Sequence, residues 1–130
     1  MVFSVTPIYA LAVAGIYLVL WYRVTAMRGN LRLSIGDGGD QTLLLRVRQH
    51  GNCAEWSSFV LILMILAEGM NTSTVYLHAT GALLLVGRIV HPFGLKVAQA
   101  DHMLRYLGNG TNILAALIMM VCLAIALLTA

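Results

Sequence analysis

Long apolar stretches, separated by short polar segments, run from one end of the chain to the other. A helix that crosses the hydrocarbon core of a membrane needs about 20 mostly apolar residues. Stretches of this kind predict helices over 5–27, 41–68, 73–97 and 103–129. We therefore expect an all-α membrane protein, a bundle of four transmembrane helices that forms a single domain over residues 1–130.

The polar segments between these stretches carry the signals of loops and helix ends. Residues 36–40 read Gly-Asp-Gly-Gly-Asp, which is a strong loop signal, and the carboxylate of Asp40 is placed to cap the helix that follows. A tight connection is expected at 69–72. A polar turn precedes the last helix and holds Gln99, Asp101 and His102.

Composition agrees with a membrane location. Hydrophobic residues make up 60% of the 130 residues and charged residues only 10%, whereas soluble domains carry about 25% charged residues. The alternative, a soluble four-helix bundle, needs a polar outer face on every helix, but residues 113–130 carry no charge. The net charge of +3 is small, and no basic patch suggests nucleic acid. Cys53 and Cys122 form neither a disulfide framework nor a metal-ligand spacing.

The eight basic residues surround the first and third connections. Loops rich in Lys and Arg stay in the cytoplasm, so both termini and the second connection are expected to face away from it. In a bacterium the membrane would be the inner one. The first stretch is expected to be an uncleaved span, because Arg23 and Arg28 follow its apolar run, whereas basic residues precede that of a signal peptide.

The helix predicted over 41–68 carries charged and amide side chains at membrane depth. Ionisable groups at this depth are costly and usually face a protein interior or a wet cavity. At about 100° per residue, Arg48, Asn52 and Glu55 fall on one arc of this helix. They offer a cation, an amide and a carboxylate to one zwitterionic ligand. The alternative is that they satisfy partners on neighbouring helices, and the spacing leaves both interpretations open.

The helix predicted over 73–97 repeats this pattern with Arg88 and His91 on one arc. Arg88 lies deep enough to need a partner, and Glu55 is a candidate for it. His91 is a second binding candidate, with a hydrogen-bonded core histidine as the alternative. Pro92 lacks an N–H group and is expected to kink the helix near its cytoplasmic end.

Two short motifs resemble the MAPEG family, the membrane-associated proteins of eicosanoid and glutathione metabolism. The family has Arg, then Asn four residues on, then Glu three residues further, and this chain has Arg48, Asn52 and Glu55 at that spacing. Residues 87–91, Gly-Arg-Ile-Val-His, resemble a Gly-Arg-x-x-His segment of the family. The short loop at 36–40 is most similar to that of small bacterial members.

The resemblance implies a homotrimer of four-helix protomers that binds glutathione, as a co-substrate, between neighbouring protomers near the cytoplasmic side. Carried over by position, Arg48, Asn52 and Glu55 would hold the tripeptide, and Arg88 and His91 would support it from the next helix.

Arg105 approximately matches the arginine that activates the glutathione thiol in some members of the family, although its interval from Arg88 is slightly longer. The alternative for Arg105 is an interface anchor that snorkels toward the headgroups. Two positions depart from the family pattern. Members that bind glutathione tightly often have a basic residue in place of Gly51, and many have a tyrosine in place of Leu95.

The implied activity is that of a glutathione-dependent membrane transferase or peroxidase, in which a glutathione thiolate attacks a lipophilic electrophile or a lipid hydroperoxide. Lowering the pKa of a thiol from about 8.5 by about 2 requires about 2.7 kcal/mol. An arginine about 4 Å away, at an effective dielectric near 20, supplies about 4 kcal/mol before desolvation. The alternative is a non-catalytic trimeric membrane module that binds a lipid or a small anionic ligand. The expected partners are further copies of the chain, membrane lipids and a lipophilic substrate whose identity the sequence does not give.

Overall fold

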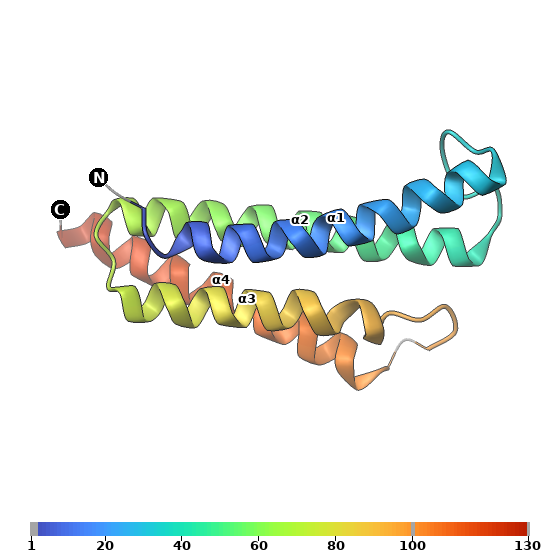
Figure 1. Ribbon diagram of the computed structural model, residues 1–130. Helices are drawn as coiled ribbons and strands as arrows, with labels where there is room; N and C mark the ends of the chain where they lie inside the picture. The colour runs from blue at the N-terminus through green and yellow to red at the C-terminus, as the bar shows by residue number, and fades with distance from the viewer. Residues whose placement is uncertain (1–2, 100, 130) are drawn as a thin grey trace.

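The computed structural model describes residues 3–99 and 101–129. In that part of the chain it contains the helices α1 (Thr6–Leu31), α2 (Gln41–Gly69), α3 (Thr74–Gly94) and α4 (Met103–Thr129). Successive helices run in opposite directions (Figure 1). The start of α1, the end of α4 and the α2–α3 connection therefore share one end of the bundle, and the two basic connections share the other.

Three of the described helices, α1, α2 and α4, are long and apolar enough to cross a membrane. The remaining helix, α3, holds the buried polar residues Arg88 and His91. Because α2 and α4 run in the same direction (Figure 1), the chain between them must return across the bundle along α3. The predicted all-α membrane protein with a four-helix bundle is thereby confirmed.

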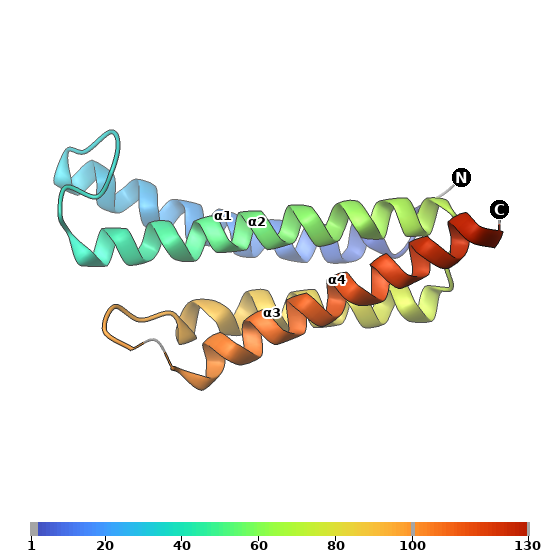
Figure 2. The same ribbon diagram turned by 180° about the vertical axis from the view of Figure 1, so that it is seen from behind.

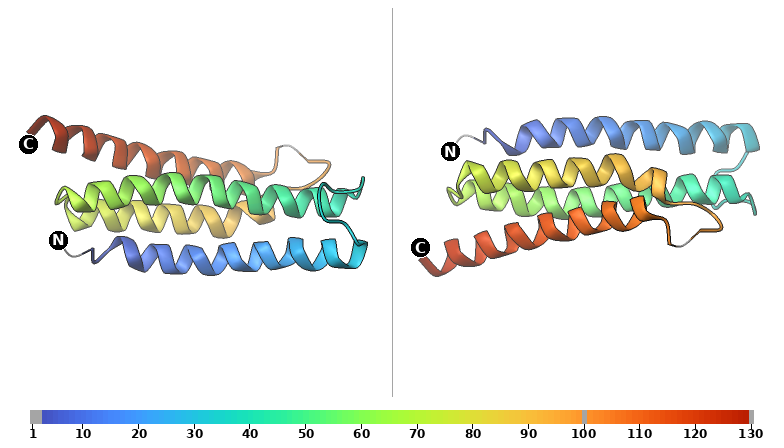
Figure 3. Two further views of the ribbon diagram at one scale, coloured as in Figure 1. Left: turned by 90° about the horizontal axis from the view of Figure 1, so that it is seen from above. Right: turned by 90° about the horizontal axis from the view of Figure 1, so that it is seen from below.

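The helices form two faces, with α1 and α3 toward the viewer in Figure 1 and α2 and α4 toward the viewer in Figure 2. Seen from above or below the view of Figure 1, α1 and α4 lie on the outside, with α2 and α3 between them (Figure 3). Buried apolar side chains from all of the described helices meet in one core, which includes Val13, Val60, Met64, Leu77, Leu84 and Met119. Large apolar side chains on the outside, such as Leu11 and Leu128, suit contact with lipid.

The helix α1 continues past its expected end at residue 27 to Leu31. Arg32 has a left-handed backbone (φ 55°) and its N–H donates to the carbonyl of Gly29, while the N–H of Leu33 donates to the carbonyl of Arg28. This pair of bonds satisfies the last carbonyls of a helix. Arg23 and Arg28, which follow the apolar run in the sequence, therefore lie within this helix.

The helix α3 ends at Gly94, before its expected end at residue 97. Pro92 lies in its last turn and has no N–H to donate to a preceding carbonyl. Leu95 is already extended, with φ −86° and ψ 111°. Pro92 thus coincides with the end of the helix instead of a kink within a longer one. The helices α2 and α4 begin and end within one residue of the expected bounds, 41–68 and 103–129.

Two carboxylates cap the N-termini of α1 and α2. Asp40 accepts hydrogen bonds from the N–H groups of Thr42 (2.8 Å) and Leu43 (2.9 Å), as the sequence predicted. The cap of α1 was not predicted, because it comes from Glu68 at the far end of α2 (α1 has no side-chain cap of its own). The Glu68 carboxylate accepts from successive backbone N–H groups, those of Ser4 (2.6 Å), Val5 (2.8 Å) and Thr6 (2.8 Å).

Candidate functional site

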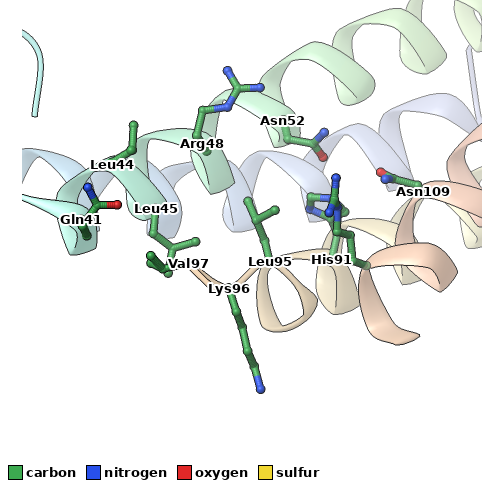
Figure 4. Close-up of a pocket in the computed structure, with 11 residues that line it drawn as sticks. Gln41, Leu44, Leu45, Arg48, Asn52, His91, Leu95, Lys96, Val97 and Asn109 are labelled. Atoms are coloured by element: carbon green, nitrogen blue, oxygen red, sulfur yellow. The ribbon is translucent and has the colours of Figure 1, made fainter. Parts of the chain in front are cut away.

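A cavity of about 310 Å³ opens at the end of the bundle that holds the basic connections (Figure 4). Its lining comes from α2, α3, α4 and the segment after α3: Gln41, Leu44, Leu45, Arg48, Asn52, His91, Leu95, Lys96, Val97, Arg105 and Asn109. The structure therefore brings four of the predicted site residues, Arg48, Asn52, His91 and Arg105, to the wall of one cavity.

Glycines place Arg105 beside His91. A Cβ atom added at Gly94 would lie 2.1 Å from the backbone nitrogen of Arg105, and one added at Gly108 would lie 2.7 Å from the Cβ atom of His91. Small residues allow membrane helices to approach this closely. Because Gly94 and Gly108 have no side chains, the start of α4 packs closely against the end of α3. Arg105 and His91 therefore lie near each other.

Hydrogen bonds from buried side chains hold α2 against α3 at the same level. The amide nitrogen of Gln49 donates to the carbonyl of Pro92 at 2.7 Å. Arg88 is only 1% exposed, and its Nη1 donates to the side-chain oxygen (2.8 Å) and the backbone oxygen (3.0 Å) of Asn52. Because the side-chain oxygen of Asn52 accepts from Arg88, the amide nitrogen is the group that Asn52 offers to a ligand in the cavity.

Arg88 and Glu55 do not line this cavity. The hydrogen bonds that Arg88 makes within the described chain go to Asn52, so Glu55 is not its partner inside the protomer. Glu55 is exposed and lies beside Trp56 and Phe59 in a separate recess of about 240 Å³. Arg48 is also exposed, and its side chain extends from α2 away from His91 (Figure 4).

The cavity is cationic. Its described lining includes Arg48, Lys96 and Arg105 but no Asp or Glu, although the side chain of Lys96 extends away from the others (Figure 4). Two buried polar atoms at its wall, Nδ1 of His91 and Oδ1 of Asn109, have no hydrogen-bond partner within residues 3–99 and 101–129. Such a lining favours an anionic ligand that also carries hydrogen-bonding groups.

Several residues of the site were not predicted from the sequence. Asn109 lies one helical turn after Arg105, so the i, i+4 spacing that was applied to α2 identifies it on the same face of α4. Gln49 lies outside the predicted arc of α2 because it faces α3 rather than the cavity. No local pattern reveals its bond to Pro92, since the two residues are far apart in the chain.

The family model of the MAPEG family matches residues 6–125. Over 90 residues the chain is 32% identical to the inner membrane protein YecN of Escherichia coli (strain K12), a match that covers 69% of each chain. The protein of the same name from Escherichia coli O6:H1 matches with the same identity and coverage. No solved structure matches the chain.

Proposed function

This chain belongs to the MAPEG family, and from that premise we propose that it is a glutathione-dependent transferase or peroxidase of the inner membrane. Membership of the family supports a membrane protein related to glutathione or lipid metabolism. The finer proposal is that a glutathione thiolate attacks lipophilic electrophiles or lipid hydroperoxides. The observation that carries it is the cationic cavity lined by Arg48, Asn52, His91 and Arg105.

The chemistry of the cavity suits glutathione, a tripeptide with two carboxylates and a thiol. Its volume of about 310 Å³ lies within the range of small-molecule sites, about 300–1,000 Å³. In the proposal, Arg48 and the amide nitrogen of Asn52 bind a carboxylate and a peptide carbonyl. His91 supplies a further hydrogen-bonding group, and Arg88 acts as a positioning residue because it reaches the cavity only through Asn52.

Arg105 is the residue proposed to activate the thiol. A guanidinium keeps its charge at neutral pH and stabilises the thiolate over the thiol. In the transferase reaction the thiolate sulfur forms a bond to the electrophilic carbon, and the leaving group departs as an anion. In the peroxidase reaction the sulfur attacks the terminal peroxide oxygen, which releases an alkoxide. A second glutathione then reduces the resulting sulfenic acid to the disulfide and water.

A homotrimer is part of the proposal, because it gives Glu55 a place at the site. Arg48 and Glu55 are both exposed on α2 of the isolated protomer. If a neighbouring protomer packs on this face, both side chains lie at the boundary between protomers, where Glu55 can bind the ammonium group of glutathione. The cavity lies at the basic end of the bundle, which is expected to face the cytoplasm, so glutathione enters from the cytoplasm and the apolar substrate from the bilayer.

A specific observation favours the second candidate, a non-catalytic module for a lipid or a small anion. Leu95 lines the cavity where many members have a tyrosine, and it cannot donate a hydrogen bond. Gly51 has no side chain, so it supplies no cation near Glu55, where other members often have a basic residue. Both departures reduce the number of groups that bind glutathione.

Titration calorimetry of the purified protein with glutathione separates the two candidates. Saturable heat at millimolar ligand or below supports the proposal, and its absence supports the module. In Arg105→Ala we expect glutathione to bind while the ultraviolet absorbance of its thiolate is lost. An unchanged thiolate absorbance in that variant removes Arg105 from the mechanism. Turnover of a halonitrobenzene and of a lipid hydroperoxide then distinguishes a transferase from a peroxidase.

A further inference from the structure

The inner end of the cationic cavity, which we call its floor, differs in chemistry from its opening. The helix α2 runs inward from the basic end of the bundle, and Asn52 is the deepest residue that it contributes to the lining. By the same reasoning His91 is the deepest lining residue of α3, and Asn109 is the deepest of α4. The cations of the lining all lie nearer the opening: Arg48, Lys96 and Arg105. The floor is therefore polar, but it holds no arginine, lysine or carboxylate.

Side chains from three helices converge on this floor. In Figure 4 the amide groups of Asn52 and Asn109 both point toward His91, which lies between them. Oδ1 of Asn52 accepts a hydrogen bond from Arg88 at 2.8 Å. Oδ1 of Asn109 is buried and has no hydrogen-bond partner within residues 3–99 and 101–129. Asn109 thus brings a buried and unused acceptor to the floor.

An unused acceptor selects among ligands. A buried oxygen without a partner is costly, because it has lost its hydrogen bonds to water. A ligand that donates to Oδ1 of Asn109 removes this cost, whereas a ligand that has no donor leaves it in place. The proposed function includes two classes of second substrate. An organic hydroperoxide carries an O–H group, but an electrophile such as a halonitrobenzene has no hydrogen to donate. The floor therefore favours the hydroperoxide.

We propose that Asn109 is the residue that determines the specificity of this site, and that its amide binds the hydroperoxyl group of an organic hydroperoxide. This inference rests on the proposed glutathione-dependent function. Oδ1 accepts from the O–H of the terminal oxygen, and Nδ2 donates to the oxygen that is bound to carbon. An amide offers both an acceptor and a donor, so it matches both oxygens of the R–O–O–H group at once.

The position of Asn109 also suits the chemistry. Arg105 lies four residues earlier on α4, which is about 6 Å along the helix axis. A thiolate beside Arg105 is therefore within one helical turn of a hydroperoxide on Asn109, and reaction requires that the sulfur and the terminal oxygen approach to about 3–3.5 Å. The S–O bond forms as the O–O bond breaks, which yields a sulfenic acid and an alkoxide. Nδ2 of Asn109 stabilises the developing alkoxide, which then takes a proton from water.

Turnover of cumene hydroperoxide and of chlorodinitrobenzene, each with glutathione, tests the proposal in Asn109→Leu. Leucine has about the size of asparagine but neither donates nor accepts a hydrogen bond. We expect the ratio of kcat/KM for the hydroperoxide to kcat/KM for the halonitrobenzene to fall about 25-fold, because two hydrogen bonds are lost and each contributes a factor of about 5. Thiolate formation cancels in this ratio, since both reactions share it. An unchanged ratio would overturn the proposal.

Tyr106→Phe is the matched control. Tyr106 also lies on α4, directly after Arg105, and the substitution also removes a hydrogen-bonding group. Tyr106 is exposed and does not line the cavity, so the ratio should equal that of the wild type. A fall in Tyr106→Phe as large as that in Asn109→Leu would show a general effect of changes in α4 and would contradict the role of Asn109.

Titration calorimetry with glutathione separates this inference from the function on which it rests. We expect the Kd for glutathione in Asn109→Leu to lie within about twofold of the wild-type value, which also shows that the variant folds. A loss of affinity equal to the loss of peroxidase activity would assign Asn109 to a peptide N–H of glutathione. That result would overturn the hydroperoxide site while the proposed function stands. A wild-type protein that binds no glutathione and turns over neither substrate would refute the proposed function, and this inference with it.

Discussion

The carboxylate of Glu68 holds the first turn of α1 against the end of α2, and removing it has a calculable local effect. Glu68 Oε1 accepts from the N–H groups of Ser4 and Val5, and Oε2 accepts from that of Thr6. Glu68→Gln keeps one carbonyl oxygen, replaces the acceptor for Thr6 by a donor and removes the negative charge from the helix N-terminus. The perturbation therefore acts on three consecutive backbone amides.

The magnitude follows from these contacts. A lost hydrogen bond costs about 1 kcal/mol net, and loss of the charge beside the helix dipole costs about 0.3–1 kcal/mol. The free energy of opening the first turn should thus fall by about 1.3–2 kcal/mol, which corresponds to a roughly 10- to 30-fold larger open population. Glu68→Ala removes every acceptor as well as the charge and should cost about 3–4 kcal/mol.

Amide hydrogen exchange in detergent micelles measures this effect, because exchange of protected amides follows local opening. Exchange at Ser4, Val5 and Thr6 should accelerate by that factor in Glu68→Gln, while amides in the middle of α1 keep their protection. Glu55→Gln is the matched control, since Glu55 is an exposed glutamate on the same helix. Unchanged protection in Glu68→Gln, or an equal loss in Glu55→Gln, would refute the reasoning.

Two further predictions concern the proposed glutathione cavity. Gly94→Ala puts a Cβ atom 2.1 Å from the backbone nitrogen of Arg105, so α4 must move, at a cost of about 1–3 kcal/mol in the free energy of unfolding. Thermal unfolding should report this loss, and calorimetry should report weaker glutathione binding; Gly110→Ala, where the added Cβ meets nothing within 4 Å, should change neither. Leu95→Tyr adds a hydroxyl to the cavity wall and should strengthen glutathione binding by about 1 kcal/mol, or about fivefold, in the same calorimetric titration. No gain in affinity would show that the ligand does not reach this position.

One side chain connects a groove of about 650 Å³ between α1 and α3 with the cavity, although it lines only the groove. Arg88 lines the groove between α1 and α3, and its Nη1 orients Asn52 at the wall of the cavity between α2, α3 and α4. The sequence assigned Arg88 to the glutathione site on the strength of a motif. In the structure its Nη1 donates to Asn52, while its Nε and Nη2 are buried and have no hydrogen-bond partner within residues 3–99 and 101–129.

The candidate site was predicted in part, and the reason lies in distance along the chain. Arg48 and Asn52 are one turn apart on α2, so helical spacing alone places them on one face, and both line the cavity. Glu55 shares their arc, but it is almost two turns from Arg48 and lies beside Trp56 and Phe59 instead. The sequence also suggested that Arg88 and Glu55 pair, whereas Arg88 donates to Asn52. Spacing within one helix does not fix the rotation of that helix against another.

The sequence by itself determined that this protein lies in a membrane and where its helices begin and end. The free energy of an apolar residue in lipid is a property of that residue, so a stretch of such residues identifies a span without knowledge of its neighbours. The cap at Asp40 is local in the same sense, because donor and acceptor lie within three residues. These features followed from reading the chain in order.

Only the tertiary structure decided which helix faces meet. Glu68 caps α1 from more than 60 residues away, and Gly94 and Gly108 bring His91 and Arg105 together through the side chains that they lack. Each of these contacts depends on the rotation and separation of two helices, which packing sets collectively and no single residue encodes. The membrane location and the helices can therefore be predicted from the sequence, whereas the cavity and the groove form only when the helices pack.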